Sequence, residues 1–328
     1  MAQESKTRFM IISDTHNYDF SDPKNVDNPL QHPLPPCDVV LHAGDLTYSG
    51  SVQELEDAVD MLGSIDAELR LVIAGNHDFT LDGPYMKRNP GLQRYFATID
   101  DTDVDKEQSG QHEKAMNVMR GHRAQHAGVT YLEEGLHSFT LKSGATFTIY
   151  ASPWQPEFCN MAFNYPRDTD RFNSPESIMD GVSQVIGIKV PDYPDVDIMM
   201  THGPPHGIMD AVQERRKTTQ VGCHALMTAV SRARPKLYCF GHIHEGHGAE
   251  LVEWKEDKFK IGQDAIEARE LQPIVFPQSL CPNIKHGKQT LMVNAAIMTL
   301  RYKPVNAPWL VDLDLPIKQD RINEKGEE

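Results

Sequence analysis

The amino-acid sequence predicts an α/β fold in which two β-sheets pack together and helices cover their outer faces. Three observations support this prediction: short apolar runs that end in polar clusters, helix-like segments between those runs, and hairpin-like segments in the middle of the chain. Alternation of strands and helices is typical of α/β architecture. With 328 residues, 39% of them hydrophobic, the chain can bury a large core without disulfides or metal cross-links.

Five apolar runs have the length of β-strands and are apolar at both odd and even positions. They cover residues 8–13, 38–42, 69–74, 197–201 and 236–240. Strands that are covered on both faces have this pattern. We therefore expect five strands in the interior of the protein.

Two segments between these runs have helical periodicity. Residues 51–62 begin with Ser51, a good N-cap residue, and their apolar positions recur at helical spacing. A second helix is expected from residue 223 onward, and it should end before Pro235. Residues 138–141 and 146–150 flank a plausible tight turn and predict a β-hairpin.

The sequence predicts one domain spanning residues 1–328, with a core at about 7–314. Residues 79–129 are poor in strand signals and read as an insertion, with a helix near residues 106–122. Residues 153–175 are rich in Pro and Asn and read as a long surface loop. Residues 319–328 form a polar tail.

Charge and cysteine usage exclude several classes of protein. The formal charge of −15 disfavours a dedicated binder of duplex nucleic acid and adhesion to anionic membranes. No apolar stretch is long enough for a membrane span, and the N-terminus has no signal-peptide pattern. The five cysteines are scattered without a CxxC pair, so we expect reduced thiols and a cytoplasmic protein.

Each of the five apolar runs ends in a cluster of metal-binding residue types. The clusters are Asp14-Thr15-His16, Gly44-Asp45, Gly75-Asn76-His77-Asp78, His202-Gly203 and Gly241-His242-Ile243-His244. Ligands of open α/β sheets bind at the carboxyl ends of strands, so these clusters can converge. Carboxylates, imidazoles and an amide suit divalent metals such as Mn, Fe, Zn or Co.

The number of candidate ligands suggests two metals, which require a shared ligand. Asp45 follows Gly44, whose flexible backbone can bring a bridging carboxylate to the centre. For each residue alone, ordinary turn and capping chemistry is the simpler interpretation. The five clusters in order, each directly after an apolar run, favour a multi-histidine metal site, although spacing alone leaves the ligand assignment open.

The five clusters resemble the signature blocks of the calcineurin-like metallophosphoesterases. They span residues 7–254, and the surrounding segments HAGDLT, IAGNHDFTLD and THGPP are similar to the metallophosphoesterase-domain-containing, class III phosphodiesterase-like subgroup. The resemblance implies a four-layer α/β/β/α sandwich with two stacked mixed β-sheets flanked by helices. Some members of the subgroup lack a histidine at the position of His242, which this sequence retains.

The resemblance also implies roles for individual residues. One metal would take Asp14, His16, Asp45 and His244, and the other Asp45, Asn76, His202 and His242. His77 would be catalytic, contacting a phosphoryl oxygen or protonating the leaving group; a supporting role behind the ligands is the alternative. The implied cofactors are two divalent transition-metal ions (Mn, Fe or Zn).

The activity implied by the resemblance is metal-dependent hydrolysis of phosphodiesters, small or of the cyclic-nucleotide type, by a hydroxide that bridges the metals. The expected partner is a small phosphate ester, with nucleotides among the candidates. One alternative is a phosphomonoesterase or nucleotide pyrophosphatase using the same site. Another is a non-catalytic scaffold that binds metal or nucleotide. The sequence does not indicate an oligomeric state.

Overall fold

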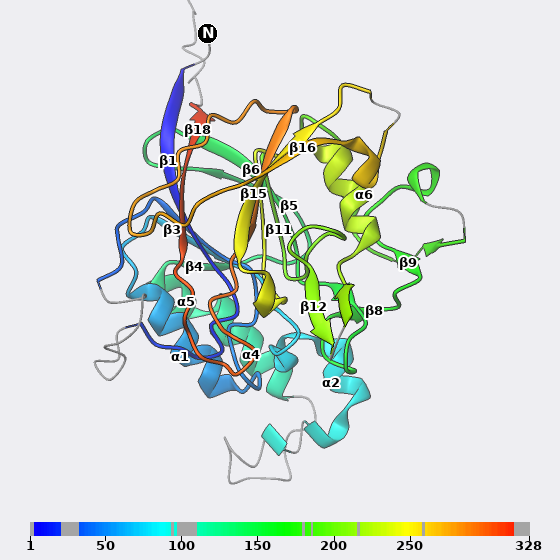
Figure 1. Ribbon diagram of the computed structural model, residues 1–328. Coiled ribbons are helices and arrows are strands. Elements are labelled where there is room, and N and C mark those ends of the chain that lie inside the picture. Colours follow the sequence, from blue (N-terminus) through cyan, green and yellow to red (C-terminus); the bar gives the residue numbers. More distant parts are fainter. Residues whose placement is uncertain are drawn as a thin grey trace, which may run out of the picture.

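The computed structural model describes residues 3–20, 33–92, 95–96, 110–178, 181–184, 186–214, 217–257 and 260–317. Two mixed β-sheets stack face to face, and helices lie on the outside of the pair (Figure 1). The predicted four-layer α/β/β/α sandwich is confirmed. The predicted tail at residues 319–328 lies outside the described residues.

The first sheet has five strands in the order β18-β1-β2-β3-β4. Its strands are β1 (Glu4–Ile12), β2 (Val39–His42), β3 (Leu69–Val72), β4 (Val129–Tyr131) and β18 (Trp309–Pro316). Strands β1 to β4 are parallel, whereas β18 pairs antiparallel with β1, with Phe9 opposite Val311. The parallel strands end at one edge of the sheet, where three of the five predicted clusters follow them.

The second sheet has seven strands in the order β16-β15-β17-β14-β11-β6-β5. They are β5 (Gly135–Thr140), β6 (Thr146–Ser152), β11 (Ile198–Thr201), β14 (Leu237–Phe240), β15 (Gly248–Trp254), β16 (Ile266–Leu271) and β17 (Gln289–Asn294). Four central strands are parallel, and β5 pairs antiparallel with β6 as the predicted hairpin. The remaining two clusters follow β11 and β14.

Alternating side chains of the inner strands pack on opposite faces. In β1, Phe9 and Ile11 point between the two sheets, whereas Met10 and Ile12 pack against the helical layer. Such alternation explains why the predicted strands are apolar at both parities. Burial on both faces holds the strand ends, and therefore the clusters that follow them, in fixed positions.

The helices form the two outer layers. They are α1 (Val52–Gly63), α2 (Gly83–Arg88), α4 (Gly110–Arg120), α5 (His122–Ala127) and α6 (His224–Ala233). Ser51 and Glu54 form a capping box at the start of α1, as expected from the N-cap residue. Helix α6 packs against the second sheet, and α1, α4 and α5 cover the first (Figure 1).

The predicted insertion contributes helices to the layer over the first sheet. Helix α4 lies within the predicted helical stretch and packs against α1, with Ala115 and Met119 in the shared core. Residues 93–94 and 97–109 of this segment lie outside the described residues. No helix in the described part of the chain is long and apolar enough to cross a membrane.

The prediction of a surface loop at residues 153–175 is only partly correct, because residues 157–160 and 166–168 are exposed but others are not. Ala162, Phe172 and Asn173 are fully buried in this segment. Arg171 explains the difference, because its guanidinium forms a nearly buried ion pair with Glu134 and stacks over the Trp154 ring. These contacts draw a segment with few regular elements into the protein interior.

Short elements complete the chain. They are β7 (Gln155–Pro156), β8 (Asn164–Tyr165), β9 (Thr169–Asp170), β10 (Ser183–Gln184), β12 (Ala211–Glu214), β13 (Lys217–Gln220) and the 3₁₀ turns Phe79–Leu81, Pro175–Ser177, His244–Gly246 and Gly262–Ala265. Strands β12 and β13 form a hairpin between β11 and α6. This hairpin lines part of the surface near the predicted site.

Candidate metal centre

The loops after β1, β2 and β14 approach one another through strained backbone positions. Asp14, Asp45 and His242 have φ angles of 56°, 54° and 67°, in the left-handed region that non-glycine residues seldom adopt. Such strain persists only where surrounding structure enforces it, and it clusters at functional sites. The carboxylates of Asp14 and Asp45 are buried at this point.

Two glycines of the predicted clusters are required by close packing against the carboxylates. A Cβ atom on Gly75 would lie 2.3 Å from the Oδ1 atom of Asp45. A Cβ atom on Gly241 would lie 2.1 Å from the Oδ2 atom of Asp14. The glycines therefore allow neighbouring loops to close over the two carboxylates.

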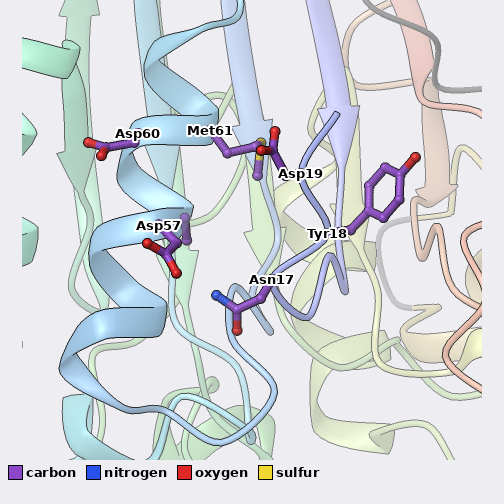
Figure 2. Close-up of a pocket in the computed structure, with 7 residues that line it drawn as sticks. Asn17, Tyr18, Asp19, Asp57, Asp60 and Met61 are labelled. Carbon is purple, nitrogen blue, oxygen red and sulfur yellow. The ribbon is translucent and has the colours of Figure 1, made fainter. Parts of the chain in front are cut away.

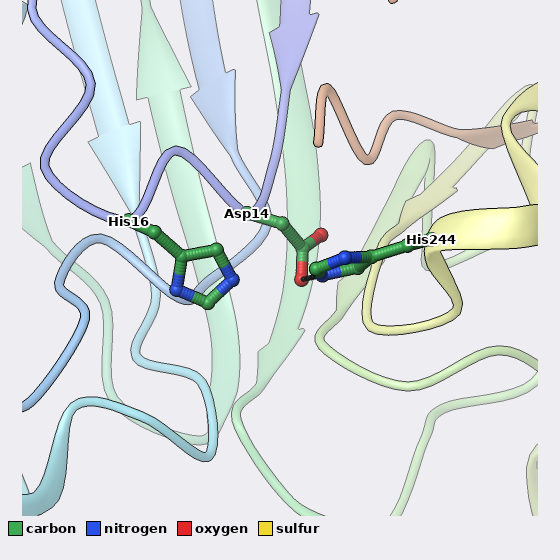
Figure 3. A group of neighbouring side chains, drawn as sticks. All are labelled: Asp14, His16 and His244. Carbon is green, nitrogen blue, oxygen red and sulfur yellow. Dashed lines mark ion pairs between the residues drawn. The ribbon is translucent and has the colours of Figure 1, made fainter. Parts of the chain in front are cut away.

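Asp14, His16 and His244 form a group whose ligand atoms all lie within 4.8 Å of one another (Figure 3). Asp14 and His16 come from the loop after β1, and His244 comes from the loop after β14. The Nε2 atom of His244 lies 3.4 Å from Oδ1 of Asp14. This group could hold a metal ion.

Asp45 connects the remaining histidines to this group. It belongs to two further clusters, one with His16 and His77 and one with Asp14 and His202. Its Oδ2 atom lies 3.7 Å from Nε2 of His16, and its Oδ1 atom lies 3.4 Å from Nε2 of His202. The two carboxylate oxygens therefore face two different histidines, as a shared ligand would.

Backbone carbonyls orient three of the histidines. The Nδ1 atom of His16 donates to Thr47 O at 3.0 Å, that of His202 to Ala43 O at 2.9 Å, and that of His244 to Thr299 O at 3.0 Å. Because a carbonyl can only accept, each Nδ1 carries the proton, and Nε2 offers a lone pair to the centre in the neutral ring.

Two observations show that this centre suits a cation. The Nε2 atom of His16 is buried and has no hydrogen-bond partner. The Nε2 atom of His202 lies 2.8 Å from Oδ1 of Asn76, so two acceptors face each other when the ring is neutral. A metal ion between such atoms would satisfy them, and the residues therefore fit a divalent metal.

The pKa values of Asp14 and His244 also favour a positive charge beside the Asp14 carboxylate. Burial opposes ionisation of Asp14, but the hydrogen bond and charge of His244 hold the Asp14 pKa below its usual range. Burial likewise opposes protonation of His244, yet its hydrogen bond to Asp14 raises the His244 pKa to about 9. Asp14 thus remains charged and faces a protonated His244, whose proton a metal ion at this position would replace.

His242 lies beside His202, with ring centroids 5.0 Å apart, and its backbone N–H donates to both oxygens of Asp14. It belongs to none of the three metal-binding groups found among the described residues. The structure therefore places His242 beside His202, without bringing its ring nitrogens into those groups.

His77 and Asp78 extend from the loop after β3. The Nδ1 atom of His77 donates to Tyr48 O at 2.7 Å, and the His77 ring lies 4.7 Å from that of His16. Asp78 is buried and accepts hydrogen bonds from the backbone N–H groups of Gly75, Leu46 and Thr47. It therefore holds the loops together, and burial raises its pKa to about 6.

His42 is fully buried beneath the loop that carries Asp14 and His16. Its Nε2 atom lies 2.9 Å from the Thr15 hydroxyl oxygen, and its Nδ1 atom accepts from Gly44 N–H. Burial lowers its pKa to about 3. A neutral His42 therefore links the first two clusters.

Sequence reasoning missed the residues that surround the histidines. Tyr302 packs against His16 with ring centroids 4.8 Å apart, and Tyr48 lies 5.0 Å from Tyr302. Thr299, whose carbonyl orients His244, belongs to the same loop between β17 and β18. No local pattern in the sequence identifies these residues, because they approach His16 only through the fold.

A separate pocket lies between α1 and the loop after β1 (Figure 2). It is lined by Asn17, Tyr18, Asp19, Asp57, Ala58, Asp60 and Met61. Its carboxylates have partners elsewhere: Asp60 pairs with Arg123, and Asp57 accepts from Gln53. None of the candidate metal ligands lines this pocket.

The fold and the cluster of buried carboxylates and histidines are those of an α/β protein that can bind metal ions. Residues 7–246 match the profile of the calcineurin-like phosphoesterase family. The chain belongs to this family, and it is a metal-dependent phosphoesterase, a hydrolase that acts on phosphate esters.

Related proteins include metallophosphoesterase domain-containing protein 1 of Homo sapiens and of Mus musculus. Each is 30% identical over 311 residues, covering 94% of this chain and 72% of the relative. A UPF0046 protein of Caenorhabditis elegans is 30% identical, covering 74% of this chain and 52% of that protein. Among solved structures, phosphopantetheinyl hydrolase from Mycobacterium tuberculosis covers 93% of this chain and 95% of its own, at 14% identity and a TM-score of 0.43.

Proposed function

We propose that this protein hydrolyses phosphodiesters with two divalent transition-metal ions (Mn, Fe or Zn). The first ion would be held by Asp14, His16, Asp45 and His244, and the second by Asp45, Asn76, His202 and His242. The observation that carries this proposal is Asp45, whose two oxygens face His16 on one side and His202 on the other.

Bound divalent ions supply an activated water near neutral pH and offset the charge that develops on the phosphoryl oxygens. The protein residues position the ligands for this task. Backbone carbonyls fix the rings of His16, His202 and His244, so little reorganisation is needed when substrate binds.

His77 is the proposed acid or phosphoryl-oxygen contact. Its Nδ1 proton is committed to the Tyr48 carbonyl, which leaves Nε2 as the functional atom. Its backbone N–H donates to Oδ1 of Asp45 at 2.8 Å, which ties its position to the shared ligand. A protonated Nε2 at this point can donate a proton to a leaving oxygen.

One feature supports a diester as substrate. Aromatic side chains border both ends of the centre: Tyr48 and Tyr302 near His16, and Phe158 near His242. Each ester group of a diester could then contact an apolar surface.

The test compares bis(p-nitrophenyl) phosphate with p-nitrophenyl phosphate at equal concentration and with added Mn²⁺. We expect kcat/KM for the diester to exceed that for the monoester. Faster hydrolysis of the monoester would favour the phosphomonoesterase alternative. No hydrolysis of either ester above that of the His77→Ala variant would favour the metal-binding scaffold.

A further inference from the structure

A cavity of about 410 Å³ opens beside His242. Its apolar lining includes Phe158, Val212, Val221 and Leu300, and its charged lining consists of Arg167 and Glu245. Small-molecule sites are typically cavities of this size, lined by apolar side chains with a few polar groups. Because His242 is part of the lining, the cavity adjoins the proposed metal centre.

The apolar lining of this cavity is unusually accessible. Phe158 and Leu300 are 48% and 64% exposed, although both are large apolar side chains. The Phe158 ring meets the His242 ring nearly edge-on, with centroids 5.7 Å apart and planes at 84°. A planar ring that entered the cavity would cover these side chains and remove apolar surface from water.

Arg167 is held in place by the backbone rather than by a carboxylate. Its Nε atom donates to Glu157 O at 3.1 Å, and its Nη1 atom donates to Val221 O at 3.2 Å. No acidic side chain of the described residues forms an ion pair with it. Its charge is therefore available to a ligand, and Arg167 and Glu245 are both exposed to water.

We propose that this cavity binds one ester group of the substrate, and that this group is a planar ring carrying an anionic substituent recognised by Arg167. The inference rests on the proposed function, because it requires the phosphate to lie at the metal centre beside His242. Arg167 is then a specificity-determining residue, since it meets the far end of the organic group and not the phosphorus.

Phosphonic acids test this proposal, because their P–C bond is not hydrolysed. Methyl-, phenyl-, 4-carboxyphenyl- and 4-(aminomethyl)phenylphosphonate are compared as competitive inhibitors of bis(p-nitrophenyl) phosphate hydrolysis. Their Kd values are also measured by calorimetry on the manganese-loaded protein, which requires no turnover. We expect phenylphosphonate to bind about 10-fold more tightly than methylphosphonate, and the carboxyphenyl compound about 5-fold more tightly still.

Two variants assign these preferences to the cavity. Arg167→Gln should reduce the carboxyphenyl-to-phenyl ratio to about 1, and Val212→Trp, which fills the cavity, should reduce the phenyl-to-methyl ratio. Arg120→Gln is the matched control, because Arg120 at the end of α4 pairs with Glu133 and does not line the cavity, and it should preserve both ratios.

Three results would overturn the proposal: equal binding of methyl- and phenylphosphonate, tightest binding of the aminomethyl compound, or an unchanged carboxyphenyl preference in Arg167→Gln. Absence of diester hydrolysis with the expected Kd ratios would overturn the proposed function and leave the cavity assignment standing. Diester hydrolysis without those ratios would overturn the cavity assignment and leave the proposed function standing.

Discussion

The two halves of the candidate metal centre differ in charge and in the side chains that surround them. The half with Asp14, His16 and His244 has its own carboxylate, whereas the half with Asn76, His202 and His242 has a neutral amide in the equivalent role. Asp45 lies between them, with one oxygen facing His16 and the other facing His202, and in the proposed centre it would serve both. Since each carboxylate offsets one charge of a divalent ion, the first half should hold its metal more tightly than the second.

The side chains that surround the two halves also differ. Tyr48 and Tyr302 pack near His16 in the first half, and Phe158 borders His242 in the second, next to the cavity with Arg167. Asymmetry of this kind gives each ester group of a substrate a distinct environment. Among the proposed ligands, Asp45 is shared, so its loss should affect both halves.

The largest expected effect is that of Asp45→Asn. Loss of the shared charge should remove both metals and lower kcat/KM by at least about 10³-fold, because activated water and charge stabilisation depend on both ions. Elemental analysis and diester hydrolysis measure the two effects. Asp57→Asn, on the exposed surface of α1, is the control and should behave as the native protein. Two metal ions retained in Asp45→Asn would contradict its shared role.

The next effect is that of His77→Ala. Removing the proposed proton donor should lower kcat by about 10²–10⁴-fold. Metal content should stay at the native value, because His77 is not one of the proposed ligands. His126→Ala, an exposed histidine of α5, is the matched control. A native rate in His77→Ala, or a loss of metal that accounts for the lower rate, would refute the catalytic role.

The smallest effect concerns the order in which the metals leave. Graded addition of a chelator should remove one ion at a concentration at least about 10-fold below that needed for the other, because the second half has one carboxylate fewer. Metal retained per chain is measured after each step. His16→Ala should lose the ion that is otherwise retained. Simultaneous release of both ions would show that the charge difference between the halves does not control affinity.

The sequence predicted the part of the site that depends on strand ends. Asp14, Asp45 and His202 each follow a run of buried apolar residues, and the carboxyl ends of these strands meet in the fold. The order of the clusters along the chain was therefore enough to predict that their side chains converge. The four-layer arrangement followed from the same apolar pattern, together with the resemblance to the family.

The parts that could not be predicted depend on long-range contacts of irregular segments. Tyr302 and Thr299 reach His16 and His244 from a loop with no regular pattern. The burial of Arg171 within residues 153–175 accompanies its pairing with Glu134, which no local feature of either residue indicates. Periodicity identifies strands and helices, but it carries no information about which loops meet.

The central claim is that one chain holds two metal ions around a shared carboxylate. The most direct test is the number of transition-metal ions per chain in the native protein, measured beside His242→Ala. We expect about two ions in the native protein and about one in the variant, because His242 serves only the second half. One ion or none in the native protein, unchanged in the variant and not increased by added Mn²⁺, would contradict the dinuclear centre.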